Sequence, residues 1–228
     1  MPQMTALAVA GLMTGANGIA DAKRKKVVKM ALTLEGDAQV NWQGGGNLNN
    51  FIDNSKSDRT PKTGKFIQMV CWLWPIYLAW RTKVATETHL KAYRMTQDAA
   101  MFTAGVLHHP VATPKTDTDR AQPAFTFGSR DESAMGAAAF YRAGASSLGL
   151  GLPGDIVMYY RAGYEQPCHI AVQVSNAHVS SLWTVPRDAN GIDYNMPQAV
   201  ANVDLEAAIS TGANGAIVTT RHSAPPWA

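Results

Sequence analysis

Residues 152–183 read LPGDIVMYYRAGYEQPCHIAVQVSNAHVSSLW, and this stretch decides the fold. It opens with Leu-Pro-Gly-Asp, which is typical of a turn because proline fixes one φ angle and glycine frees the next. The β-branched and aromatic residues 156–160 then predict a strand. A second strand is predicted at 169–174 and a third at 178–183, with a short turn between them. We therefore expect a small antiparallel meander.

His169 is the first residue of the second predicted strand. Side chains alternate between the two faces of a strand. Ile170, Val172 and Val174 are therefore expected on the apolar face. His169 is expected on the opposite face at the start of the strand, a position that suits a general base.

The order Pro-Gly-Asp-Ile-Val, an aromatic strand, a short loop and then His-Ile-Ala-Val-x-Val-x-Asn resembles the core of the NlpC-type cell-wall peptidases. These enzymes belong to the papain-like cysteine hydrolases. In that family an aspartate-containing turn opens one strand, and the histidine that starts the next strand is the general base. Asp155 and His169 match those two positions. The resemblance implies an α+β fold of the papain-like, NlpC type, with N-terminal helices packed on a small antiparallel sheet.

The most hydrophobic stretch of the chain is 66–81, which is too short and too interrupted to span a bilayer. Pro75 lacks an amide hydrogen and is tolerated only in the first turn of a helix. A helix is therefore expected to begin near Cys71 or Trp72 and to run to Arg81 or beyond. The dipole at its N-terminus would favour a thiolate at Cys71 and lower the pKa of that thiol. The alternative is a buried cysteine in a proline-kinked core helix.

The papain-like family also places its nucleophile at the start of a buried helix upstream of the histidine, and Cys71 matches that order. Val70 and Trp72 stand where NlpC enzymes usually have aspartate and serine, so the Cys-Trp pair is more similar to papain and transglutaminase relatives. Cys168 is the only other cysteine. It directly precedes His169, so we expect the two side chains to point to opposite faces and Cys168 to be a packing residue.

A third group should orient the imidazole, and the turn between the last two predicted strands decides which one. A three-residue turn at 175–177 places Trp183 opposite His169 and Ser181 diagonal to it, whereas a two-residue turn places Thr184 opposite. The three-residue turn is favoured because Asn-Ala is a poor two-residue turn pair. Ser181 also falls where the NlpC family carries its third polar residue. The remaining candidates are Asn176, His178 and Asp188 for the third group and Gln68 for the oxyanion hole.

At 228 residues the chain is expected to form a single domain, 1–228, with an N-terminal arm at 1–64 and a helical insertion at 84–150. The insertion explains why Cys71 and His169 lie further apart than in compact NlpC domains. The helices of this insertion are predicted at 86–107 and 131–145. Outside the insertion, a loop is predicted at 36–64, a helix at 203–209 and a last strand at 216–220.

The formal charge of +3 is too small to indicate a particular anionic partner. The basic run Lys23–Lys26 is expected to be a solvated helix face. No nucleic-acid partner is expected. The run Gly44–Gly46 lacks the lysine of a nucleotide loop, and His108 and His109 lack further ligands at metal-site spacing. We therefore expect no cofactor and no metal. Residues 5–22 resemble a signal-peptide core without a basic leader, and we expect an uncleaved helix there.

The sequence thus predicts a cysteine hydrolase that uses Cys71, His169 and Ser181 on an amide bond. The resemblance implies peptidoglycan stem peptides as substrate, a cognate immunity or inhibitor protein as partner, and a bacterial effector that a dedicated secretion system exports to the target-cell periplasm. One alternative is a toxin that deamidates or cross-links a protein. The other is a non-enzymatic binding module on the same scaffold.

Overall fold

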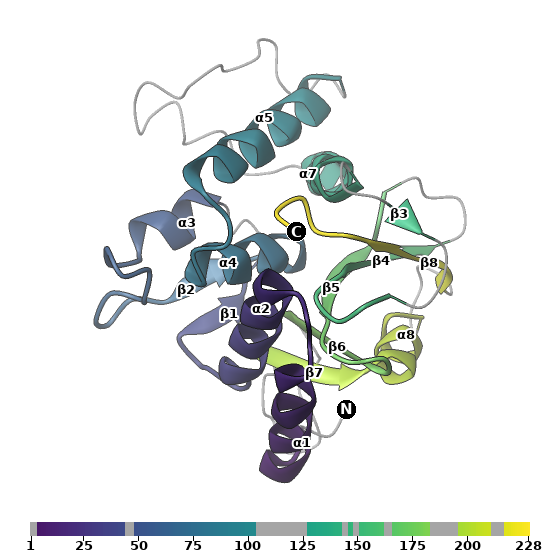
Figure 1. Ribbon diagram of the computed structural model, residues 1–228. Coiled ribbons are helices and arrows are strands. Elements are labelled where there is room, and N and C mark those ends of the chain that lie inside the picture. The colour runs from purple at the N-terminus through teal and green to yellow at the C-terminus, as the bar shows by residue number, and fades with distance from the viewer. Residues whose placement is uncertain are drawn as a thin grey trace, which may run out of the picture.

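The computed structural model has an α+β fold, with helices gathered beside an antiparallel sheet (Figure 1). It describes residues 4–43, 48–103, 127–142, 146–147, 151–161, 166–182, 196–210 and 217–228. Among these residues no helix combines the length and the apolar character that crossing a membrane requires. The α+β class predicted from the sequence is confirmed.

The main sheet has six strands in the order β3-β8-β4-β5-β6-β7, and every neighbouring pair is antiparallel. The strands are β3 (Ser146–Ser147), β4 (Ile156–Arg161), β5 (His169–Gln173), β6 (His178–Leu182), β7 (Pro197–Ala201) and β8 (Ile217–Ser223). The predicted meander is β4-β5-β6, and the predicted last strand is β8. Strand β7 was not predicted, so the sheet is wider than expected.

The turn between β5 and β6 has the predicted three residues. The N–H of Val174 donates to the carbonyl of His178 at 2.9 Å, and Val172 pairs with Ser180. Continuing this register by one residue places Ser181 opposite Ala171 and diagonal to the first residue of β5. The loop length therefore sets which β6 side chain can reach the histidine.

The remaining elements form helical layers and one small sheet. The helices are α1 (Ala6–Asn17), α2 (Ala22–Thr33), α3 (Leu48–Asp53), η1 (Cys71–Leu73), α4 (Trp74–Arg81), α5 (Glu87–Thr103), α7 (Phe127–Arg142) and α8 (Asn202–Ser210). A parallel pair joins β1 (Val40–Trp42) to β2 (Ile67–Met69). The loop predicted at 36–64 is therefore wrong in part, because Val40, Leu48 and Phe51 are buried and anchor β1 and α3 to the core.

The central strands are buried on both faces. Ile156 and Met158 of β4 face the large core, which also contains residues of α2 and α4. Val157 and Tyr159 face a smaller apolar cluster that includes Leu205 of α8. Figure 1 shows α8 on one side of the sheet and α2 and α4 on the other. We call these the α8 face and the α4 face.

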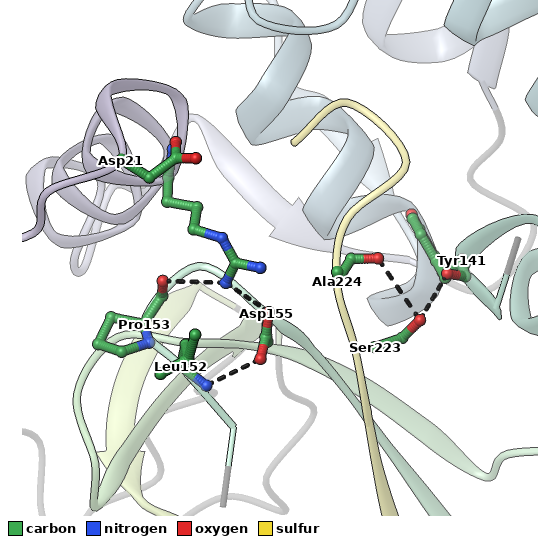
Figure 2. A network of polar contacts seen from close by, with 8 residues as sticks. Asp21, Tyr141, Leu152, Pro153, Asp155, Ser223 and Ala224 are labelled. Atoms are coloured by element: carbon green, nitrogen blue, oxygen red, sulfur yellow. Dashed lines mark hydrogen bonds and ion pairs between the residues drawn. The ribbon is translucent and has the colours of Figure 1, made fainter. Parts of the chain in front are cut away.

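The basic run at the start of α2 is only partly the solvated face that the sequence predicts. Arg24 forms an ion pair with Asp155 in the turn that opens β4, and its Nη1 also donates to the carbonyl of Pro153 at 3.4 Å (Figure 2). The second carboxylate oxygen accepts from the N–H of Leu152 at 2.8 Å. Gly154 has φ +94°, and a Cβ there would lie 2.7 Å from the Cβ of Arg24. Glycine is thus required for this close approach.

Candidate functional site

Cys71 begins the helical segment that the sequence predicts, directly after β2 and the extended residue Val70. The segment starts as η1 and continues as α4, with Pro75 in the first turn of α4, where its missing N–H breaks no helical hydrogen bond. Cys71 is only 4% exposed and belongs to the large core. The helix start is therefore confirmed, and the thiol is buried rather than open to solvent.

The turn that carries Cys71 is held in place by its neighbours. Tyr141 of α7 donates its hydroxyl to the carbonyl of Trp72 at 2.7 Å. Element η1 packs against both α7 and β5. The cysteine turn therefore lies beside the strand whose first residue is His169.

His169 is 5% exposed, and its Nε2 lies 2.8 Å from the Oγ of Ser181. The same hydroxyl donates to the carbonyl of Ile170 at 3.0 Å. A hydroxyl has one hydrogen, so an Oγ that donates to Ile170 accepts from the imidazole N–H. In this tautomer, Nδ1 is the ring nitrogen that can accept a proton. Ser181 is thus placed where the sequence predicts an orienting group.

Burial and, to a lesser extent, the charge of Arg161 lower the pKa of His169 to about 3. The imidazole is therefore neutral near pH 7, and a neutral imidazole can accept a proton. An imidazolium that would hold a preformed thiolate is not the resting state of this histidine. Any thiol would have to transfer its proton during the attack itself.

The two faces of β5 separate the candidates. His169 pairs with Tyr159 of β4, and their rings are 6.0 Å apart. The Tyr159 hydroxyl contacts Asn202 of α8, so His169 is on the α8 face. Ile170 points to the α4 face and shares the large core with Cys71. The structure thus joins His169 to Ser181 on the α8 face, whereas Cys71 belongs to the core on the α4 face.

Cys168 is half-buried, and its thiol donates to the carbonyl of Tyr159 at 3.3 Å. Burial raises the pKa of this thiol, which makes it less reactive. It packs against the apolar cluster on the α8 face, as predicted for a packing residue. The prediction that Cys168 and His169 point to opposite faces is wrong, because Cys168 precedes the strand and the two-residue alternation starts only at His169.

The other predicted candidates lie elsewhere. Asn176 is exposed in the β5–β6 turn, and His178 contacts the Oγ of Ser175 at 3.0 Å, so both lie at the end of β5 opposite to His169. Gln68 lies in β2, three residues before Cys71, and its N–H donates to Asn50 at 2.8 Å. The described residues do not include Asp188, Trp183, Thr184, His108, His109 or Gly44–Gly46.

A polar network on the α8 face was not predicted. Tyr159 and Asn202 are hydrogen-bonded, the Asn202 amide donates to Glu206 at 2.9 Å, and Thr220 donates to the same carboxylate at 3.0 Å. This network fixes α8 to β4 and β8 next to His169. The sequence of β4, Ile-Val-Met-Tyr-Tyr-Arg, does not alternate between polar and apolar residues and gave no signal for this network.

The described residues contain no group of three or more His, Cys, Asp or Glu side chains that could hold a metal ion. Comparisons of the chain with protein-family models, with curated proteins and with solved structures found no match.

Proposed function

We propose that this protein is a papain-like cysteine hydrolase that cleaves amide bonds in peptides, with Cys71 as nucleophile, His169 as general base and Ser181 as the residue that orients the base. One observation carries the proposal. A buried, neutral histidine, bonded through Nε2 to a serine, begins the strand against which the cysteine turn packs. A general base needs a fixed orientation and a neutral resting state, and the hydrogen bond to Ser181 and the lowered pKa of His169 support both.

In the proposed reaction the Cys71 sulfur attacks the amide carbonyl while its proton passes to Nδ1 of His169. The imidazolium then protonates the leaving amine as the C–N bond breaks, which leaves a thioester. Water, deprotonated by His169, cleaves the thioester and regenerates the thiol. The backbone N–H of Cys71 and the side chain of Gln68 are proposed to stabilise the oxyanion.

The proposed substrate is the stem peptide of bacterial peptidoglycan. The resemblance of 152–183 to NlpC-type peptidases supports this choice, since those enzymes cleave peptide bonds of the cell wall. A secreted effector acting in the target-cell periplasm, with a cognate inhibitor protein, is the matching biological setting.

A second candidate is a non-enzymatic binding module, and the separation of the two faces of β5 favours it. Cys71 is almost fully buried in the core that Ile170 lines, whereas His169 faces α8. In that case Cys71 is a packing residue, and the His169–Ser181 pair stabilises the sheet.

Incubation with purified peptidoglycan, followed by mass spectrometry of the released fragments, tests the proposal. Cys71→Ala should abolish hydrolysis without loss of the fold, and the matched control Cys168→Ala should retain it. Alkylation of Cys71 should inactivate the enzyme, and a chelator should not. Activity that survives the loss of Cys71 contradicts the mechanism, and product formation from a protein but not from peptidoglycan would favour a deamidating or cross-linking toxin.

A further inference from the structure

Arg161, the last residue of β4, is a half-buried arginine with no acidic partner among the residues that the structure describes. Its Nη2 donates to the carbonyl of Ile209 in the last turn of α8 at 2.9 Å. Its Nε is buried and has no acceptor. The ion pair that the described residues contain is that of Arg24 with Asp155. Asp155 lies directly before the start of β4, whereas Arg161 lies at the end of this strand. Nothing in the described part of the chain neutralises Arg161.

This arginine lies beside the candidate base. Tyr159 pairs directly with His169, and Arg161 follows two residues later, on the same face of β4. Its contact with Ile209 confirms that it faces α8. The positive charge of Arg161 also acts on Cys168 and on His169, the first residue of β5. Burial raises the pKa of Cys168 and Arg161 opposes this rise, whereas burial lowers the pKa of His169 and Arg161 adds to this fall.

We propose that Arg161 is a binding site for a carboxylate of the peptide substrate, next to His169. The inference rests on the proposed function and specifies its substrate as a peptide with a free carboxylate near the cleaved bond. An unpaired guanidinium that is partly removed from water is destabilising, and an incoming carboxylate relieves that cost. The Nε–H, which lacks an acceptor among the described residues, can donate a charge-assisted hydrogen bond to a carboxylate oxygen.

Carboxylate binding would also activate the base. The charge of Arg161 is the second cause, after burial, of the low pKa of His169. A carboxylate on Arg161 offsets that charge, so the imidazole becomes a stronger base when substrate is bound. The free enzyme would then keep a weak base, and a substrate without the carboxylate would be cleaved slowly as well as bound weakly.

The kinetic test uses two forms of the same peptidoglycan fragments, one with free carboxyl groups and one with those groups converted to amides. Arg161→Gln should raise KM for the carboxylate form about tenfold to hundredfold, the usual range for loss of a charged hydrogen bond, and should leave KM for the amide form unchanged. Arg221→Gln is the matched control, because Arg221 lies on neighbouring β8 over the ring of Tyr160. Equal losses for both substrate forms would overturn the proposal.

A second readout needs no catalysis. In Cys71→Ala, the chemical shift of the His169 ring is followed by NMR from pH 7 to pH 2, with trifluoroacetate, which stays ionised over this range, or neutral trifluoroacetamide at constant ionic strength. Trifluoroacetate should raise the pKa of His169, trifluoroacetamide should not, and Arg161→Gln should raise the pKa of His169 and remove the response to trifluoroacetate. Arg161→Lys keeps the charge and serves if the glutamine variant does not fold. An unchanged His169 titration in Arg161→Gln refutes the site, whereas an active Cys71→Ala refutes only the proposed function.

Discussion

Adjacent serines in β6 contact different parts of the protein. Ser181 contacts His169 on the α8 face, while Ser180 accepts a hydrogen bond from the indole of Trp74 at 3.3 Å on the α4 face. The alternation of a strand accounts for this difference, and the three-residue turn fixes which serine reaches the histidine.

We therefore predict that Ser181→Ala lowers kcat about tenfold to hundredfold, since the imidazole loses the partner that holds its tautomer. Ser181→Thr keeps the hydroxyl and should restore most of the rate. Ser180→Ala is the control, and steady-state kinetics with a denaturation curve should show reduced stability with kcat intact. A similar fall in kcat for both alanine variants would contradict an orienting role for Ser181.

At this scale the sequence predicted the location of Cys71 and His169 and the contact between His169 and Ser181. It left the burial of Cys71 open as an alternative, and it did not predict the face shared by Cys168 and His169. Turn length and alternation are local properties that a sequence displays. The packing of Tyr141 over the cysteine turn and the proximity of Arg161 depend on segments distant in the chain.

Between elements, the ion pair of Arg24 and Asp155 joins α2 to the turn that opens β4 (Figure 2). Both side chains are largely buried, with 13% and 9% of their surfaces exposed. Removal of one partner leaves the other charge buried, so Asp155→Asn should reduce the free energy of unfolding by about 3 kcal/mol. Urea denaturation of this variant, of Arg24→Met and of the double variant measures the coupling free energy between the two side chains. Additive effects of the two substitutions would show that the pair contributes nothing of its own.

Elements with a strong local pattern were predicted, and those fixed by tertiary contacts were not. Strands β4, β5 and β6 carry β-branched runs between turn residues. Strand β7 reads Pro-Gln-Ala-Val-Ala and is a weak strand former by composition. It is held by its pairing with β6 and by the Gly36 N–H, which donates to Pro197 at 2.9 Å.

For the whole molecule, buried His169 and half-buried Glu35 impose opposite pH dependences on stability. The pKa of His169 falls from 6.5 to about 3 on folding, so the unfolded chain binds more protons in that interval and stability decreases as pH falls through it. Burial raises the pKa of Glu35 from 4.5 to about 7, although the Ala199 N–H opposes this. The folded chain then binds more protons, so stability decreases as pH rises from 4.5 to 7. Between pH 4.5 and pH 6.5, the effects of the two groups on the free energy of unfolding have opposite signs and cancel.

Glu35→Gln should therefore match the parent protein in stability at pH 4.5 and exceed it at pH 8, because only the parent has to ionise a half-buried carboxyl. Urea denaturation at the two pH values provides the measurement. Since other groups titrate equally in both proteins, the difference isolates Glu35. A stability difference that is the same at both pH values would rule out this origin.

The contacts of α2 also have a kinetic consequence. Lys23 donates to the carbonyl of Trp227 at 2.8 Å, across 204 residues of chain, and Arg24 meets Asp155 across 131. During synthesis on the ribosome, this helix therefore has to wait for partners that emerge 131 and 204 residues later. Closing such large loops costs chain entropy before any contact stabilises them. Folding is therefore slow. The nascent chain would expose its apolar stretches until those partners have been synthesised, which makes assistance by a chaperone valuable at that stage.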